Sequence, residues 1–283
     1  DNNDLESVDL SSLETVDSNF YIQSHDYLES VDLSSLTEVA STLYLYQNDM
    51  LYDVELPVLE SIGGSLEIYY NYSNGIETLY APVLESVGGS VYVYYNQNLQ
   101  EIDLSSLIEI GNQLYIYQAD QLDVLELGML EEVGSSLYIY GSDQLEAIEL
   151  DSLTEISGSM TVSYNNGLET LSAPLLESLS SNLYIQENPD LNTIDLSSLE
   201  CVSDYTIEGN DLSEEEQYDL LVQLTCASED SLIVFRGEDA DDFCDLGETE
   251  IENLYINALG SDAIDLSCIE TITGYLEIEN SIA

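Results

Sequence analysis

The chain has 283 residues, of which 58 are Asp or Glu and only one is Lys or Arg, so its formal net charge at pH 7 is −57. Proteins that bind nucleic-acid phosphates need clustered Lys and Arg, and this composition excludes that class. It also argues against docking on an anionic membrane. No run of about 18 apolar residues is present, so no membrane insertion is predicted. Hydrophobic residues make up 44% of the chain and recur at fixed intervals, which predicts a folded protein with a large core.

A repeat of 23 residues runs through most of the sequence from Leu5 onward. The third copy is two residues longer than the others, around Asn71-Tyr72-Ser73. Counted from the first residue of each copy, apolar residues fall at positions 1, 4, 6, 9, 12, 16 and 18. The pairs 4/6 and 16/18 alternate with polar residues, which predicts two short strands per repeat. The nine copies begin at Leu5, Leu28, Leu51, Ile76, Leu99, Leu122, Leu145, Leu168 and Leu191.

Each repeat predicts one coil of a solenoid, because a unit this short cannot bury its own apolar side chains and must stack on its neighbours. Pro57, Pro82 and Pro174 all stand at position 7, directly after the first strand, where a missing N–H costs least. Gly63 and Gly64 stand in the turn before the second strand. We therefore predict an all-β solenoid, a leucine-rich right-handed parallel β-helix of about nine 23-residue coils with one C-terminal capping helix.

The motif L-E-S-V-x-x-x-x-L-E-S-V-G-G-S-L-Y-I, repeated over residues 5–211, resembles the receptor L-domain type of leucine-rich β-helix. That type occurs in growth-factor receptor ectodomains and in many microbial surface proteins. The resemblance therefore implies an extracellular or cell-surface module that binds or supports and is not an enzyme, and it implies no particular ligand. Position 9 carries Leu instead of the usual Asn or Cys of a leucine-rich repeat, and no helix is predicted after it, which favours all-β coils.

An amphipathic helix is predicted near residues 212–225, where the repeat ends. Ser213 and Glu216 have the spacing of a capping box. A solenoid needs a cap on its open end, and we expect this helix to provide it. Its apolar stripe consists of Leu220, Leu221 and Leu224.

The segment 231–235 predicts a closing strand, and the repeat pattern restarts beyond it. We therefore predict two domains: the β-helix with its capping helix at 1–240, and the start of a second L-domain-like unit at 241–283. The sequence read from Ala283 on to Asp1 forms a further plausible coil. The chain is accordingly expected to be part of a tandem array.

All four cysteines lie in the C-terminal part of the chain and allow three connectivities. We favour Cys201–Cys226, which would tie the last coil to the helix, and Cys244–Cys268, which would staple the second unit. Metal binding by these cysteines is the less favoured alternative, because no C-x-x-C pair is present. Disulfides indicate an oxidising, extracellular setting.

Tyrosines crowd positions 17 and 19, which flank the inward-pointing positions 16 and 18 and so point outward. Stacked coils place them in two adjacent columns about 4.8 Å apart from ring to ring. Tyrosine has a preference for strands, but an exposed aromatic patch of this size is more typical of an interface. The partner is expected to be another copy, a neighbouring protein or a polysaccharide. The predicted interface residues are Tyr44, Tyr46, Tyr69, Tyr92, Tyr94, Tyr115, Tyr117, Tyr138 and Tyr140.

Carboxylates form a second outward column at position 5, which includes Asp9, Asp32 and Asp103. Unit charges about 5 Å apart repel by about 0.8 kcal/mol in water. Raised carboxyl pKa values, high salt or bound cations such as Ca²⁺ are expected to offset this repulsion. The favoured interpretation is a solvated acidic face, and weak, non-specific cation binding at these three aspartates is the alternative. No other cofactor is predicted.

No motif in the chain predicts catalysis: His25 is the single histidine, and no G-x-S-x-G or phosphate-binding loop accompanies it. Asn71 begins the sequon N-Y-S on the longer corner, where we expect it to be exposed and a candidate for glycosylation. The resulting hypothesis is an extracellular structural or self-assembling module, in a fibre or a cell-surface layer, with the tyrosine columns as its interface. The alternative is an adhesin-type module that binds glycan or a solid surface.

Overall fold

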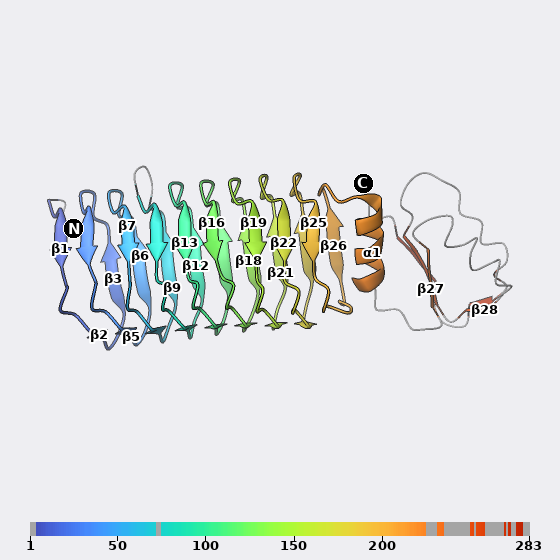
Figure 1. The fold of residues 1–283 in the computed structure, drawn as a ribbon, viewed down its shortest axis with the longest axis horizontal. Coiled ribbons are helices and arrows are strands. Elements are labelled where there is room, and N and C mark those ends of the chain that lie inside the picture. The colour runs from blue at the N-terminus through green and yellow to red at the C-terminus, as the bar shows by residue number, and fades with distance from the viewer. Residues whose placement is uncertain are drawn as a thin grey trace. The chain divides into compact units, whose positions relative to one another are not determined.

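The computed structural model describes residues 4–71, 75–224, 231–234, 250–251, 253–257, 269, 271–272 and 276–279. The chain forms two compact units, Asp1–Leu212 and Ser213–Ala283. The first unit is a parallel β-solenoid whose successive coils lie side by side along one axis (Figure 1). Neighbouring coils pair residues 23 apart, as Phe20 with Leu43, which confirms the predicted repeat.

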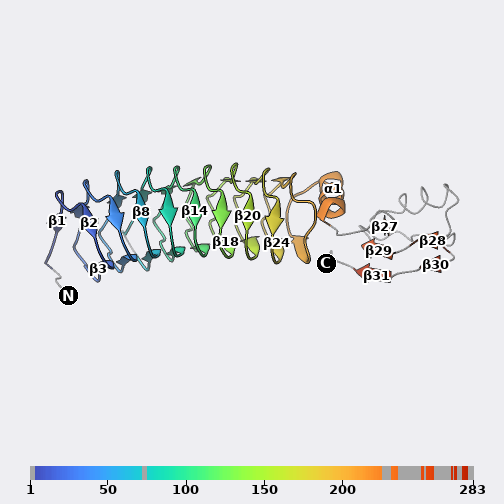
Figure 2. The same cartoon turned by 90° about the horizontal axis from the view of Figure 1, so that it is seen from below.

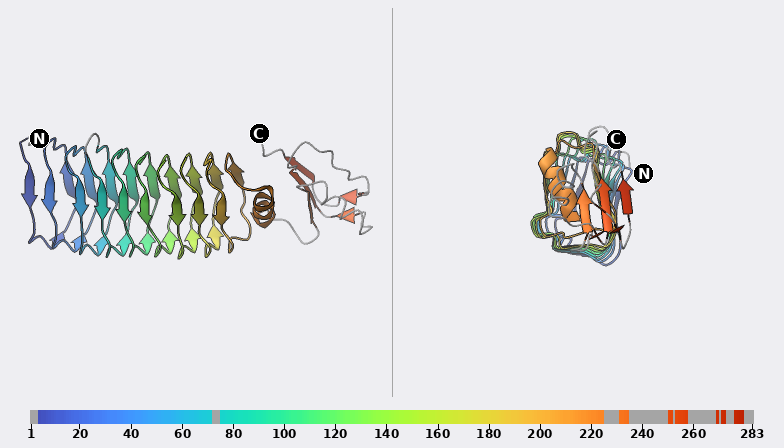
Figure 3. Two further views of the ribbon diagram at one scale, coloured as in Figure 1. Left: turned by 45° about the horizontal axis from the view of Figure 1, so that its top comes forward. Right: turned by 90° about the vertical axis from the view of Figure 1, so that its right-hand side faces the viewer.

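Eight of the nine coils contain three strands, whereas the sequence predicted two. The additional strand covers only positions 11 and 12, as in the pairing of Glu38 with Ser61 and of Val39 with Ile62. Two residues are too few to show alternation, so the periodicity could not reveal this strand. Viewed along the axis, the outlines of the coils superimpose (Figure 3, right), and the strands of each kind form their own face.

The first strands of the coils form what we call the acidic face. They are β1 (Ser7–Asp9), β4 (Ser30–Asp32), β7 (Asp53–Glu55), β10 (Thr78–Tyr80), β13 (Glu101–Asp103), β16 (Val124–Glu126), β19 (Ala147–Glu149), β22 (Thr170–Ser172) and β25 (Thr193–Asp195).

The two-residue strands form the short-strand face, a continuous sheet visible in Figure 2. They are β2 (Thr15–Val16), β5 (Glu38–Val39), β8 (Ser61–Ile62), β11 (Ser86–Val87), β14 (Glu109–Ile110), β17 (Glu132–Val133), β20 (Glu155–Ile156) and β23 (Ser178–Leu179).

The four-residue strands form the tyrosine face, a continuous nine-stranded sheet. They are β3 (Phe20–Gln23), β6 (Leu43–Tyr46), β9 (Leu66–Tyr69), β12 (Val91–Tyr94), β15 (Leu114–Tyr117), β18 (Leu137–Tyr140), β21 (Met160–Ser163), β24 (Leu183–Gln186) and β26 (Tyr205–Glu208).

The core of the solenoid is the stack of apolar positions that the repeat predicts. In the fifth coil every one of the seven positions from Leu99 to Ile116 is at most 1% exposed. Aliphatic side chains of successive coils therefore rest on one another along the whole unit. Burial of this kind is worth about 25 cal/mol per Å² of apolar surface and is the main stabilising contribution to a stack of coils.

A column of asparagines follows the tyrosine face at position 21. The backbone N–H of Asn48 donates to Asn71 Oδ1 at 2.9 Å, and Asn71 Nδ2 donates to Asn96 Oδ1 at 2.9 Å. Asn96 Nδ2 in turn donates 2.8 Å to the carbonyl of Ile68 in the preceding coil. All but the last of these asparagines are buried. The column comprises Asn48, Asn71, Asn96, Asn165, Asn188 and Asn210, and it is interrupted by Ala119 and Ser142.

The asparagine column overturns the expectation that Asn71 is exposed. Its side chain is fully buried, and besides Asn96 its Nδ2 contacts the carbonyls of Leu45 and Tyr69, each at 3.3 Å. An N-linked glycan would have to be attached to this same nitrogen. The folded solenoid has no room for a glycan there, so the glycosylation prediction is wrong for the folded chain. The next residues of the sequon, 72 and 73, lie outside the described part.

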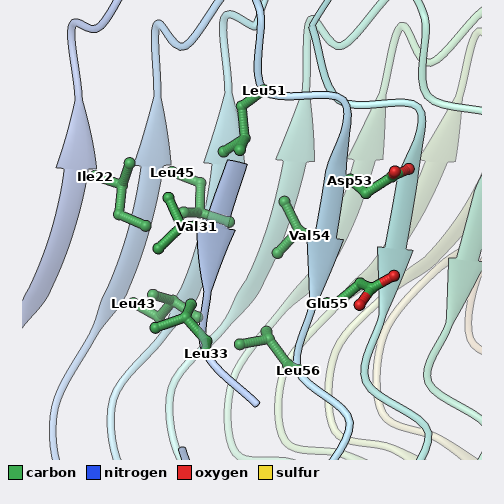
Figure 4. A pocket seen from close by; sticks show the side chains of 10 residues that line it. All are labelled: Ile22, Val31, Leu33, Leu43, Leu45, Leu51, Asp53, Val54, Glu55 and Leu56. Carbon is green, nitrogen blue, oxygen red and sulfur yellow. The ribbon is translucent and has the colours of Figure 1, made fainter. Parts of the chain in front are cut away.

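The acidic face is not continuous, because its strands fall into sheets of two, four and three strands. One break separates β4 from β7, and a small apolar cavity lies beneath it (Figure 4). Val31, Leu33 and Val54 line this cavity, whereas Asp53 and Glu55 point away from the aliphatic cluster. The second break separates β16 from β19.

The second unit contains α1 (Glu214–Leu224). The predicted capping box is confirmed, because Glu216 Oε2 accepts from the backbone N–H of Ser213 at 3.0 Å and the N–H of Glu216 donates to Ser213 Oγ at 3.2 Å. The predicted apolar stripe is also buried. Whether the helix caps the solenoid stays a prediction. The stripe consists of Leu220, Leu221 and Leu224.

The remaining strands of the second unit are also parallel. β27 pairs with β29, and β29 with β31. The segment predicted to close the first stack therefore belongs to the sheet of the second unit. The predicted domain limits at 240 and 241 lie outside the described residues. The strands are β27 (Ser231–Val234), β28 (Glu250–Ile251), β29 (Asn253–Asn257), β30 (Thr271–Ile272) and β31 (Leu276–Glu279).

Candidate functional site

The nine predicted interface tyrosines all lie on the tyrosine face, on the five consecutive strands from β6 to β18. Strand pairing places Tyr92 beside Tyr115 and Tyr115 beside Tyr138, so the predicted column is confirmed. The side chains at positions 16 and 18 of the same strands are buried in the core. We call the nine outward tyrosines the Tyr wall.

Most rings of the Tyr wall stack along the solenoid axis. The centroids of Tyr69 and Tyr94 are 4.8 Å apart with planes 3° from parallel. Those of Tyr115 and Tyr138 are 4.9 Å apart at 9°. Each stacked ring covers the faces of its neighbours, so these parts of the wall present ring edges and hydroxyls to solvent. Offset stacks of this kind add about 0.5–1.5 kcal/mol per pair beyond burial, so the wall also stiffens the sheet.

The stack is interrupted near the middle of the wall. At position 17 of the third coil the sequence has Glu67 instead of a tyrosine, and this residue pairs with Tyr92 of the next strand. An open hollow of about 470 Å³ lies at this place. We call it the central hollow; it is lined by Glu67, Tyr92, Tyr94, Tyr95, Tyr115 and Tyr117.

Several pairs of rings around the central hollow are steeply inclined to each other, although Tyr115 and Tyr117 are stacked, with planes 23° apart. Tyr94 and Tyr115 are inclined by 80°, and Tyr95 and Tyr117 by 85°, with centroids 6.4 and 5.3 Å apart. Tyr92 is likewise inclined to Tyr115, by 66°. A neighbour that meets a ring edge-on leaves much of that ring's face uncovered. The central hollow is thus a place on the wall where parts of the ring faces are available to a ligand.

Burial controls the ionisation of the groups in the hollow. It raises the pKa of the Glu67 carboxyl. It also raises the pKa of Tyr94 to about 12, with smaller contributions from Tyr69, Tyr70 and the charge of Glu67. At neutral pH Tyr94 is therefore a neutral phenol. Burial disfavours the charged form of Glu67, which a nearby positive charge would stabilise.

Sequence reasoning missed the tyrosines at position 20, among them Tyr70 and Tyr95. Both have positive φ angles, 56° and 57°, and their rings stack on each other at 5.2 Å. Strict alternation would turn position 20 inward, but a left-handed residue ends the alternation and turns it outward. Tyr164 has the same backbone conformation and contacts Tyr140 at 4.9 Å. The sequence did carry a sign of this conformation, because position 20, directly after the strand, is a polar residue or glycine in successive coils.

The three candidate cation ligands have a different local role. Oδ1 of Asp9 accepts from the backbone N–H of Ser11 at 3.0 Å, and Asp32 and Asp103 make the same contact with the serine two residues on. These bonds close the turn after each strand. The Ser11 hydroxyl, which donates to Asp9 Oδ1 at 2.7 Å, and then the Ser11 N–H lower the pKa of Asp9. Within the described residues, no group of three or more His, Cys, Asp or Glu is arranged to hold a metal ion.

Of the cysteines, only Cys201 lies in the described part of the chain, shortly before β26. Cys226, Cys244 and Cys268 lie outside it, so both predicted disulfides stay predictions. His25 occupies position 21 of the first coil, at one end of the asparagine column.

The fold places the chain in the class of parallel β-solenoid proteins built from short repeats. Comparisons with family models, with curated proteins and with solved structures found no match to this chain. The receptor L-domain resemblance therefore stays a resemblance. In the part of the chain that the structure describes, no helix is both long and apolar enough to cross a membrane.

Proposed function

We propose that the solenoid is a structural module of an extracellular or cell-surface assembly and that the Tyr wall is the surface through which copies meet. The observation that carries this proposal is the distribution of charge. On a chain with a net charge of −57, the outward positions of the tyrosine face hold only two carboxylates, Glu67 and Glu208, from β3 to β26.

The other two faces are unsuited to contact between copies. Carboxylates recur on the acidic face at position 5, as at Asp32 and Glu55, and on the short-strand face at position 11, as at Glu109 and Glu132. Two such faces brought together would place like charges opposite one another, which costs several kcal/mol when the contact excludes water. The Tyr wall avoids this cost, so self-association is expected to use it.

The stacked rings also reduce the entropic cost of association. A tyrosine has few rotatable bonds, and a ring held between two others is already ordered before a partner arrives. Tyr69, for example, lies between Tyr46 and Tyr94 at 5.0 and 4.8 Å. A rigid, flat, uncharged surface of this kind is typical of an interface.

An extracellular location is supported by the receptor L-domain resemblance and by the predicted disulfides. A glycan-binding adhesin is less favoured. Sugars bind aromatic side chains by stacking on ring faces, and in most of the Tyr wall neighbouring rings already cover those faces, as at Tyr69 between Tyr46 and Tyr94.

Sedimentation velocity and electron microscopy of the full chain at 0.15–0.5 M NaCl test the proposal. Concentration-dependent oligomers or fibres are expected, with screening by salt favouring them. Tyr138→Glu, which copies the natural Glu67 at the same position of the repeat, is expected to leave the fold intact and to abolish assembly. Ser172→Glu adds the same charge on the acidic face and is expected to assemble like the wild type. A wild-type chain that stays monomeric to millimolar concentration would contradict the proposal.

A further inference from the structure

We propose that the central hollow binds a small organic cation, a quaternary ammonium such as choline, between the tyrosine ring faces and the carboxylate of Glu67. The lining supplies five phenol rings and one acid, all on strands or strand ends of one rigid sheet. The proposal goes beyond assembly, because it assigns a ligand to a hollow in the wall.

The arrangement of the rings provides the walls of a cage. Tyr94 stands at 80° to Tyr115 and at 71° to Tyr95, and Tyr95 stands at 85° to Tyr117. Rings that meet at right angles direct faces toward a shared volume from different sides. The negative potential over an aromatic face attracts a cation within about 6 Å of the ring centroid, and several faces together form the usual recognition site for methylated ammonium groups.

Several contacts hold the cage in shape before a ligand binds. The hydroxyl of Tyr92 donates 2.9 Å to Gln113 Oε1, and Tyr95 is hydrogen-bonded to Tyr117. Tyr94 is stacked on Tyr69 at 4.8 Å. The rings therefore need little reordering on binding, which lowers the cost of association.

Charge selects the sign of the ligand. Glu67 stands in the tyrosine column at the rim of the cage, and burial raises its pKa, so a bound cation stabilises its charged form. The field of a chain with a net charge of −57 concentrates cations and repels anions. A neutral ligand would gain nothing from Glu67 or from this field.

Metal ions fit the hollow less well than an organic cation. Ca²⁺ takes about six to eight oxygen ligands and Mg²⁺ needs a near-octahedral set of about six, whereas the hollow offers one carboxylate and five phenols, of which Tyr94 stays neutral with its pKa of about 12. A methylated ammonium is weakly hydrated, so it loses little when it exchanges water for ring faces.

Isothermal titration of the full chain with choline chloride at 0.15 M NaCl tests the proposal, and 3,3-dimethylbutan-1-ol serves as the neutral ligand of the same shape. We expect choline to bind with a Kd on the order of 0.1–1 mM and the neutral alcohol to bind at least about tenfold more weakly. Equal affinity for both ligands, or no choline binding below about 50 mM, would overturn the proposal.

Variants distinguish specific binding in the central hollow from non-specific attraction by the negative charge of the whole chain. Glu67→Gln and Tyr115→Leu are each expected to weaken choline binding at least about tenfold. Glu55→Gln removes the same charge from the acidic face of the same coil and is expected to change the affinity by less than about twofold. Equal losses in Glu55→Gln and Glu67→Gln would mean only non-specific attraction and would sink the site. Unfolding curves confirm that each variant is folded, and assembly is scored separately by sedimentation, so either proposal can fail without the other.

Discussion

The tyrosine face and the acidic face are built from the same coils, yet one is continuous and the other is broken. The tyrosine face is a single sheet of nine strands, whereas the acidic face falls into sheets of two, four and three strands. Both have aliphatic side chains beneath them. The two faces differ in their outward side chains, which include stacked tyrosines on the first face and opposed carboxylates on the second.

Opposed carboxylates occur at both breaks of the acidic face. One falls between Asp32 and Glu55, and the other between Glu126 and Glu149, so both place carboxylates opposite each other at position 5. Where position 5 pairs a carboxylate with an uncharged residue, as in Glu55 with Tyr80, the strands remain hydrogen-bonded. Like charges opposite each other destabilise a sheet by a few tenths of a kcal/mol to about 1 kcal/mol.

Repulsion is not sufficient by itself, because Asp9 and Asp32 are opposed in an unbroken pair of strands. Both of these aspartates accept a hydrogen bond from a serine N–H in the following turn. That bond spreads their charge over the turn and fixes their side chains. Asp103 and Glu126 are likewise opposed in an unbroken pair of strands. The comparison thus teaches that opposed acids accompany both breaks but are not enough by themselves to separate the strands.

The largest effect is expected from the asparagine column that borders the tyrosine face. Asn96→Ala removes the donor to the carbonyl of Ile68 and the acceptor for Asn71 Nδ2, and leaves buried polar groups without partners. The free energy of unfolding should fall by about 2–4 kcal/mol. Denaturant unfolding followed by circular dichroism measures it.

Asn112→Ala is the matched control, since Asn112 is exposed. It should change stability by less than about 0.5 kcal/mol. An equal effect of the two substitutions would show that the column contributes nothing beyond asparagine's general properties. In that case the continuity of the tyrosine face would rest on ring stacking and aliphatic burial alone.

A smaller effect is expected from repairing the acidic face. The double variant Asp32→Asn/Glu55→Gln removes the opposed charges at the first break and should stabilise the chain by about 1 kcal/mol. It should also slow hydrogen exchange at the N–H of Leu33, which faces the break. Hydrogen exchange resolved by NMR or mass spectrometry measures the local effect.

A control for total charge is Glu14→Gln/Glu131→Gln, because neither acid is opposed by another at its position in the next coil, where Thr37 and Thr154 stand. It should leave exchange at Leu33 unchanged. The gain from Asp32→Asn/Glu55→Gln should also shrink in 1 M NaCl, where the Debye length is about 3 Å. A gain that is independent of salt would indicate a packing effect and contradict the role assigned to charge.

Much of this comparison could be predicted from the sequence, because stacked coils repeat each position at one place in space. The repeat predicted the core positions and placed Tyr92, Tyr115 and Tyr138 in one column, and the strand pairing confirms both. It also predicted the acidic column that contains Asp9 and Asp32. Once the period of 23 residues was recognised, these features required only the alternation of strands.

Apart from the two-residue strand, the missed features depend on backbone geometry that ends the alternation. A left-handed residue at position 20, such as Gln47 with φ 54°, turns position 21 inward. Asn48 is therefore buried, although the sequence placed it in a polar corner. The same reversal turned Tyr95 outward into the central hollow and hid Asn71 from solvent. Asparagine at an expected turn gives no sign of its direction, so composition alone could not identify the column.

The smallest effect is expected on the pH dependence of stability, and it should differ in sign between Glu67 on the tyrosine face and Asp9 on the acidic face. Burial raises the pKa of Glu67 above its ordinary value of 4.5, so the folded chain holds this proton more tightly than the unfolded chain, and stability from this group falls as pH rises through that raised pKa. Glu67→Gln should therefore stabilise the chain at pH 7, by less than about 1 kcal/mol because the group is partly exposed, and the gain should vanish below about pH 4.

Hydrogen bonds from Ser11 lower the pKa of Asp9, so the contribution of Asp9 to stability is present at pH 7 and is lost as pH falls through the lowered pKa. Asp9→Asn should accordingly destabilise the chain at pH 7 and have no effect at low pH. Unfolding curves of both variants from pH 3 to pH 8 should therefore diverge from the wild type in opposite directions as pH rises, and curves that shift in the same direction would contradict the different environments of the two faces.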